Sequence, residues 1–152
     1  MNSLEHLKEL YFYNDWANRR VVFALRDSPS EKALGIMSHI LITEKEYFER
    51  LYGKDSTGFD FWQHLSRKDC KDLVQENSER FFNLLKGFED EGLDISTKYK
   101  TSEGISHTNT YREILTHVLF HSMNHRGQIN TILRQEGFET VSTDYIIYLR
   151  NN

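Results

Sequence analysis

Residues 111–137, YREILTHVLFHSMNHRGQINTILRQEG, predict one long helix that carries three of the seven histidines in the chain. Thr110 followed three residues later by Glu113 is the capping-box pattern that starts a helix, and Gly137 is a typical left-handed stop after one. The three histidines are four residues apart and are His117, His121 and His125. One helix therefore presents three imidazoles at the spacing of successive turns.

Two of these imidazoles lie on the side of the helix that should face the core. At about 100° per residue, His121 and His125 fall inside the arc marked by apolar residues, whereas His117 lies roughly 80° from His125. A buried imidazole needs a hydrogen-bond partner or a metal, and two residues four apart can bring their ring nitrogens to one cation. His121 and His125 therefore form a candidate half-site. The alternative is a pair of core histidines bonded to tyrosines, of which the chain has eight.

The residues between this pair narrow the type of site. The segment 121–125 reads HSMNH and lacks the glutamate of the HExxH motif, which disfavours a metalloprotease. Arg126 and Gln128 follow directly, and each could either line the site or hydrogen-bond the helix bundle.

A third ligand must come from another element. Ser30 is a candidate cap for a second helix that runs to about Tyr52, with Gly53 as its stop. His39 stands at the edge of the apolar arc of this helix, so it can reach a groove between helices. The remaining histidines are expected to be solvated and are His6, His64 and His107. Two carboxylates of the same helix could also bind a metal but resemble ordinary surface charges, and these are Glu44 and Glu46.

The rest of the chain completes an all-α fold, expected as a four-helix bundle in a single domain over residues 1–152. Asn2 or Ser3 can cap a first helix to about Asp27, and Ser66 with Asp69 can open a third to about Asp90. Alternation within 95–108 predicts a small hairpin between the third and fourth helices, and 144–150 predicts a short final helix. In the first helix Asn14 and Asn18 are polar residues at core spacing, expected to be surface or interhelical hydrogen-bonders rather than pocket residues.

Composition excludes several classes of function. A net charge of −4 without a clustered basic stripe argues against a nucleic-acid partner. No apolar run reaches the roughly 18 residues of a membrane span, and no signal-peptide pattern opens the chain, so we expect a cytoplasmic protein with no membrane partner. The single cysteine, Cys70, excludes an internal disulfide; its charged neighbours predict an exposed position with no nucleophilic role.

Several segments together resemble the DinB family of damage-inducible, metal-binding four-helix proteins, which includes the YfiT-like thiol transferases and is distinct from the DNA polymerase of the same name. The resemblance covers nearly the whole chain. Its segments are YNDWANRRV (13–21), SHILITEKEYFERLYG (38–53), HSMNHRGQI with LRQEG (121–129 and 133–137) and DYIIYL (144–149).

The resemblance implies a four-helix bundle, commonly a homodimer, that binds one divalent metal through three histidines. By motif position these ligands are His39, His121 and His125, and the metal is Zn, Ni or Fe. The implied activity is a metal-dependent enzyme, either a thiol-dependent S-transferase or a hydrolase, with a small-molecule substrate or a low-molecular-weight thiol as partner. The alternative is a non-catalytic metal-binding stress-response protein. The chain departs from the family pattern at Asn124, where a second histidine is frequent, and in lacking prolines before the final helix.

Overall fold

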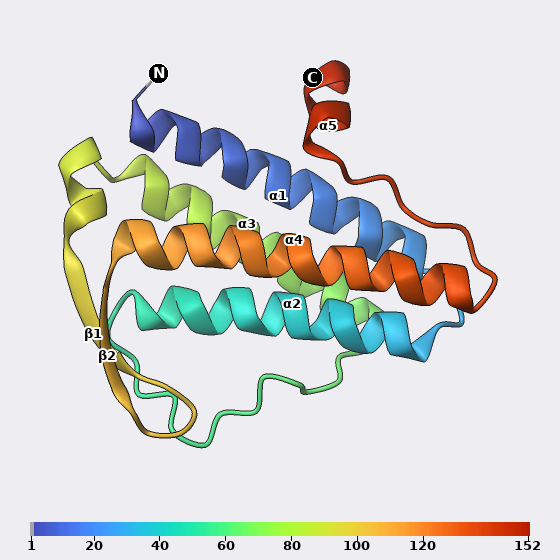
Figure 1. Cartoon of the computed structure of the whole chain (residues 1–152), viewed down its shortest axis with the longest axis horizontal. Coiled ribbons are helices and arrows are strands. Elements are labelled where there is room, and N and C mark those ends of the chain that lie inside the picture. The colour runs from blue at the N-terminus through green and yellow to red at the C-terminus, as the bar shows by residue number, and fades with distance from the viewer. Residues whose placement is uncertain (1) are drawn as a thin grey trace.

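Four long helices make up most of the structure, a computed structural model that describes residues 2–152 (Figure 1). They are α1 (Ser3–Leu25), α2 (Glu31–Arg50), α3 (Arg67–Lys86) and α4 (Tyr111–Gln135). The expected all-α bundle is confirmed.

Side chains at the helix starts explain where each helix begins. In each of the four long helices a short polar side chain accepts a hydrogen bond from a backbone N–H of the first turn, which otherwise has no partner. The capping residues are Asn2, Ser30, Ser66 and Thr110, as the sequence predicts. The stop after α4 is also confirmed, because Gly137 adopts a φ of 82°, which strains any residue with a Cβ.

The order of the helices around the bundle decides which faces meet. α1 packs against α3 and α4, and α2 packs against the same two helices. α1 and α2 therefore lie diagonally across the bundle from each other. Figure 1 shows by its colour gradient that α1 and α4 run in one direction and α2 and α3 in the other. α2 and α4 are therefore antiparallel neighbours, which places the middle turns of the two histidine-bearing helices opposite each other.

Two apolar clusters fill the bundle, one toward each end. The first includes Leu4, Phe81 and Leu115, and the second includes Val21, Met37 and Leu133. Between them every helix contributes buried polar residues. These are Asn14 and Asn18 from α1, Glu44 from α2, Asn77 and Ser78 from α3, and Ser122 and Arg126 from α4. The core is therefore two apolar layers separated by a polar one.

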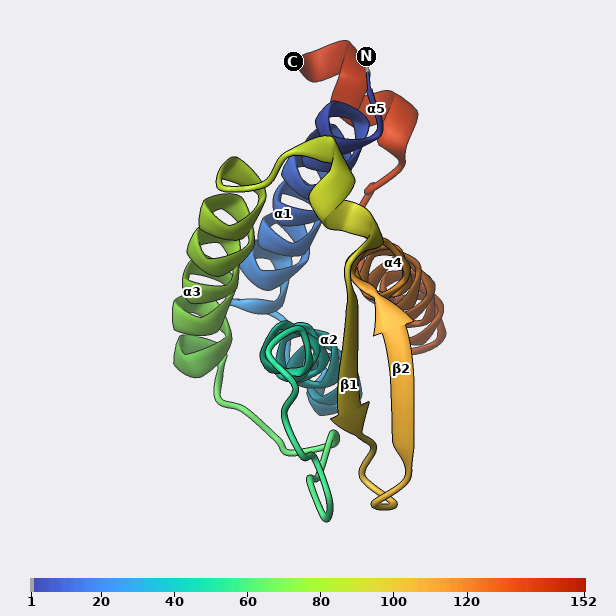
Figure 2. The same cartoon turned by 90° about the vertical axis from the view of Figure 1, so that its left-hand side faces the viewer.

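The long connections close one end of the bundle. α3 stops at Lys86 rather than near Asp90, because Gly87 caps it and a short 3-10 helix, η1 (Asp90–Asp94), follows. The expected hairpin is present as antiparallel strands β1 (Ser96–Lys100) and β2 (Ser106–Thr110). Figure 2 shows this hairpin lying beside α2 and α4, next to the loop that follows α2.

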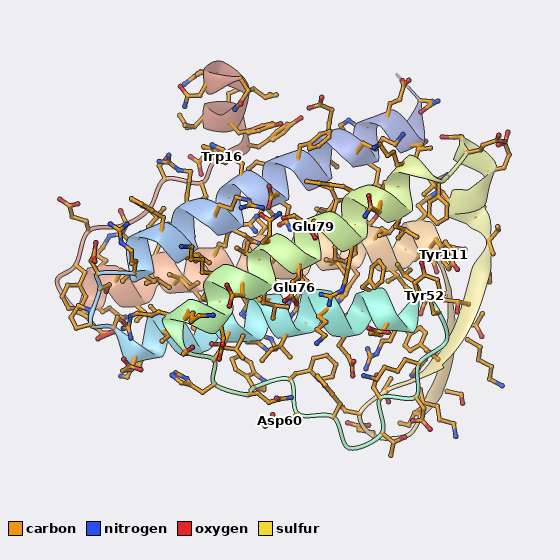
Figure 3. The ribbon with its side chains drawn as sticks, turned by 180° about the vertical axis from the view of Figure 1, so that it is seen from behind. Trp16, Tyr52, Asp60, Glu76, Glu79 and Tyr111 are labelled. Carbon is orange, nitrogen blue, oxygen red and sulfur yellow. The ribbon has the colours of Figure 1, made fainter. Side chains whose placement is uncertain are left out.

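The final helix, α5 (Tyr145–Asn151), packs on the outside of α1. Tyr13 contacts the rings of Tyr145 and Tyr148, and Trp16 contacts Tyr148. Figure 3, which labels Trp16, shows α5 beside this part of α1. Aromatic contacts on α1 therefore hold the end of the chain, which lacks the family's prolines.

One sequence expectation about the fold is wrong. Cys70 is 1% exposed, and its thiol lies 3.8 Å from the hydroxyl of Ser38 on α2. Its charged sequence neighbours lie on the outside of α3, whereas Cys70 itself faces the second apolar cluster. Burial raises the pKa of this thiol, in keeping with a packing role. Among residues 2–152, no helix combines the length and the apolar character needed to cross a membrane.

Candidate metal centre

The structure brings together three histidines from two helices. His39 of α2 is buried, and His121 and His125 of α4 are partly buried. One ring nitrogen of each lies within 4.8 Å of the corresponding atom of the other two. These are the histidines that the sequence placed in a candidate site.

A backbone carbonyl fixes the orientation of His39. Its Nδ1 lies 2.7 Å from the carbonyl oxygen of Phe61, and a carbonyl can only accept, so Nδ1 carries the proton. The lone pair of Nε2 is then free on the opposite side of the ring. The indole of Trp62 also stacks on this imidazole, with ring centres 3.6 Å apart and an interplanar angle of 1°. His39 is therefore held both in tautomer and in ring plane.

A side-chain amide fixes His125 in the same way. The Nδ1 of His125 lies 2.7 Å from Oε1 of Gln128, one turn further along α4. The amide oxygen accepts from Nδ1–H, so Nε2 again carries the lone pair. A metal-binding histidine usually donates a hydrogen bond of this kind from the ring nitrogen that does not bind the metal. Gln128 thus supports the site.

The third histidine completes the cluster. The Nε2 of His121 lies 3.1 Å from Nε2 of His39. Without a metal, His121 can donate its proton across this gap. Two nitrogen ligands of one tetrahedral zinc ion lie about 3.3 Å apart, given Zn–N bonds of about 2.0–2.1 Å, so the observed spacing also fits a shared cation. The spacing of His39 and His121 therefore suits a neutral hydrogen-bonded pair, and the two rings could bind a shared metal with little movement.

Burial and nearby histidines lower the pKa values of two of these rings, His39 and His121. Desolvation, followed by the influence of the neighbouring histidines, lowers the pKa of His121 to about 3. Desolvation also lowers the pKa of His39, against the Phe61 hydrogen bond, which raises it. A metal ligand must be the unprotonated imidazole, so both rings are ready for metal at neutral pH.

The other histidines stay outside the cluster. His117 is exposed and lies with its ring centre 5.8 Å from that of His121 and 4.9 Å from that of Tyr47. The predicted solvated histidines, His6, His64 and His107, are all exposed.

The loop after α2 is the part of the site that sequence reasoning missed. Residues 54–65 have neither helical nor strand periodicity, so their sequence predicts no more than an irregular connection. In the structure this loop covers His39, which hydrogen-bonds the Phe61 carbonyl and stacks against the Trp62 ring. A signal for it exists in the three aromatic residues clustered in an otherwise polar stretch, Phe59, Phe61 and Trp62.

A polar layer lies behind the histidines and fixes α4. Glu44 Oε2 accepts hydrogen bonds from Asn14 and Asn18, each at 2.9 Å, and from Ser122 at 2.7 Å. Arg126 donates to the Oδ1 atoms of the same two asparagines, at 2.7 and 2.8 Å. The charges of Glu44 and Arg126 are thus linked through two amides. The asparagines are interhelical hydrogen-bonders, as expected, and Arg126 holds the bundle.

The expectation that Glu44 and Glu46 are surface charges is wrong. Glu44 is 3% exposed and Glu46 is 2% exposed. Glu46 faces the loop after α2, where its Oε1 pairs with the ammonium group of Lys54. Neither carboxylate belongs to the three-histidine group found among the described residues.

Comparison with known proteins agrees with this arrangement. The DinB family model matches residues 1–152. The chain belongs to the DinB family. Protein DinB of Bacillus subtilis (strain 168) is 29% identical to it over 160 residues, covering 93% of this chain and 92% of that protein. A second relative is the uncharacterized protein YizA of the same organism, which is 23% identical over 116 residues that cover 76% of this chain and 72% of that protein. The search of solved structures found no match.

A three-histidine group in a DinB protein is consistent with metal binding. The donor set fits a divalent ion, because imidazole nitrogen suits zinc, nickel and iron alike. Three histidine ligands would leave a coordination position open, which is the pattern of catalytic rather than structural zinc sites.

Proposed function

We propose that this DinB protein binds one divalent metal ion, Zn, Ni or Fe, through Nε2 of His39, His121 and His125. The observation that carries the proposal is the pair of hydrogen bonds to Nδ1 of His39 and of His125, which leave Nε2 of both rings free within a group whose ligand nitrogens lie within 4.8 Å of one another. The lowered pKa values of His39 and His121 and the hydrogen-bonded polar layer behind α4 support it.

We further propose a metal-dependent enzyme, a thiol-dependent S-transferase or a hydrolase acting on a small molecule. A bound divalent ion would favour the anionic form of a thiol or of water at the open position. The chain itself orients the ligands through Phe61 and Gln128, and burial lowers the pKa values of His39 and His121. Trp62 covers one face of His39 and limits the access of water from that side.

A reaction screen separates these activities. Protein loaded with zinc, nickel or iron is offered an electrophile such as a chloronitrobenzene with a low-molecular-weight thiol, and separately an activated ester without thiol. Thiol-dependent turnover that is lost in His125→Ala supports the transferase, and ester turnover with the same dependence supports the hydrolase. A metal-loaded protein that turns over neither substrate supports the non-catalytic metal-binding alternative.

A homodimer is the proposed assembly. Large apolar side chains of α4 face outward, with Phe120 63% and Met123 51% exposed. Exposed apolar side chains of this size on a bundle helix suit contact with a second copy of the chain.

A further inference from the structure

A groove of about 970 Å³ lies between the C-terminal part of α1 and the N-terminal part of α3, whereas the three histidines are on α2 and α4. Figure 3 looks onto this side of α3 and labels Glu76, which lines the groove. The apolar part of the lining is formed by Val22, Phe23 and Val74. The Phe23 ring is 65% exposed, although the guanidinium of Arg26 lies over it with 4.3 Å between its carbon and the ring centre. A large aromatic side chain is therefore available to a ligand.

Basic side chains dominate the polar part of the lining. The whole chain has a net charge of −4, but five basic and two acidic side chains line this groove. They are Arg19, Arg26, Arg67, Lys68 and Lys71, with Asp72 and Glu76. Asp72 pairs with Lys68, and Glu76 pairs with a base outside the lining. The groove is therefore a basic region on an acidic protein, and it favours a negatively charged ligand.

Two of the arginines hold the walls of the groove together. Arg67 of α3 donates to the carbonyl oxygens of Leu25 and Ser28, at 3.0 and 2.7 Å. Arg19 of α1 donates to the side-chain oxygen of Gln75 on α3 at 2.8 Å. These contacts cross between the two walls, so the groove is formed before any ligand arrives. A preformed site loses less conformational entropy on binding.

The other three cations are available for binding. The ion pairs of Arg26 with Asp27 and of Lys68 with Asp72 are exposed, so each contributes little and can be exchanged for a carboxylate of a ligand. Lys71 is exposed and forms no ion pair within residues 2–152. Arg26 follows α1 and the two lysines are on α3, so cations are present on both sides of the apolar lining.

We propose that this groove docks an acidic segment of another protein, with a bulky apolar side chain against Phe23 and Val22 and carboxylates against Arg26 and Lys71. A fatty acid carries one charge at one end, whereas the available cations flank the apolar lining on both sides. Single-stranded nucleic acid binds through several stacked aromatic rings, and Phe23 is the one aromatic residue of this lining. A helix or strand with acidic residues beside an apolar stripe matches both features. The inference does not depend on metal at the three histidines.

A nuclear magnetic resonance titration of the isotope-labelled full chain tests the proposal, because it detects weak binding and locates it on the protein. The probe is a helical peptide of glutamate and leucine with one central tryptophan, and the control peptide has lysine in place of every glutamate. The acidic peptide should shift the backbone amides of residues 19–26 and 67–76, and the lysine peptide should not. The affinity should fall several-fold between about 0.05 and about 0.5 M salt, because exposed charge pairs are screened.

Variants of exposed residues separate the charged contact from the apolar one. Lys71→Glu should weaken binding about 5-fold or more, because an attractive contact becomes repulsive. Its control is Lys98→Glu on the hairpin, which changes the net charge equally and should bind like the wild type. Phe23→Ser should weaken binding about 10-fold, whereas Phe120→Ser, 63% exposed on α4, should not. All four side chains are exposed, so the variants should keep the wild-type melting temperature.

Several results would overturn the proposal. An absence of shifts in these amides at millimolar acidic peptide, or equal weakening in Lys71→Glu and Lys98→Glu, would exclude docking in the groove. Shifts of the same amides when the protein alone is concentrated would show that a second copy of the chain covers the groove. Tighter binding of oligothymidylate than of the acidic peptide, at the same amides, would show that the groove takes a phosphate backbone instead of a protein segment.

Discussion

At the residue scale, the site depends on the hydrogen bonds that Nδ1 of His39 and of His125 form. The Nδ1 atoms of His39 and His125 face oxygens that can only accept, so both rings expose an unprotonated Nε2 before any metal arrives. Such partners typically change metal affinity 10- to 100-fold when they are removed. The sequence located all three histidines but left the role of Gln128 open, because helix periodicity does not show which amide lies against which ring.

We predict that Gln128→Met lowers zinc affinity about 10-fold or more, because an apolar side chain of similar length keeps the bulk but does not fix the tautomer of His125. Zinc affinity is measured by competition with a chromophoric chelator. Gln135→Met, at the exposed end of the same helix, is the control and should bind like the wild type. Equal affinity of the two variants would show that Gln128 does not support the site.

The lowered pKa values of His39 and His121 predict a pH dependence of the metal-free protein. In the unfolded chain these histidines have a pKa of about 6.5, so below this pH the unfolded chain binds protons that the buried rings do not bind. The free energy of unfolding therefore decreases as the pH is lowered. For His121 the loss continues until the pH reaches about 3. Urea unfolding at pH 7 and pH 4 should show a smaller loss in His121→Gln than in the wild type. An unchanged loss in this variant, matching the exposed control His107→Gln, would be inconsistent with a buried neutral His121.

At the element scale, the polar layer explains how α4 keeps its position against α1 and α2. Glu44 joins three helices through Asn14, Asn18 and Ser122, and its charge balances that of Arg126. The buried pair therefore depends on both members, since loss of one leaves the other charge buried alone.

We predict that Glu44→Gln lowers the free energy of unfolding by about 3 kcal/mol, because Arg126 loses its compensating charge while the shape of the side chain is kept. The measurement is urea denaturation followed by circular dichroism. The control is Glu79→Gln, because Glu79, which Figure 3 labels, lies on the exposed face of α3. This change should alter the free energy of unfolding by no more than about 0.5 kcal/mol. Similar stability of the two variants would argue against a coupled polar layer.

Caps and periodicity made the helices predictable, whereas contacts between elements did not follow from them. Ser30, Ser66, Thr110 and Gly137 act locally, so their roles could be read from neighbouring residues. The burial of Glu44 depends on asparagines about thirty residues away, and the cover over His39 depends on a loop without periodicity. Cys70 was likewise expected to be exposed because its local sequence does not show its contact with α2.

At the scale of the whole molecule, an exposed apolar surface on α4 predicts self-association. Sedimentation velocity at micromolar concentration should show a dimer, and Phe120→Asp should shift it toward monomer, because the interface would then bury an unpaired charge. Phe23→Asp alters an equally exposed ring on α1 and should leave the dimer intact. A wild-type monomer at this concentration would contradict the proposed assembly.

The proposed centre joins two antiparallel helices and one loop, so metal binding should report on the whole arrangement. The most direct test of a three-histidine site is the metal-to-protein ratio, determined by elemental analysis after loading with zinc and removal of the excess. We predict one zinc per chain for the wild type and for His117→Ala, and none for His125→Ala. Full occupancy in His125→Ala, or loss of zinc in His117→Ala, would contradict the assignment of the metal to His39, His121 and His125.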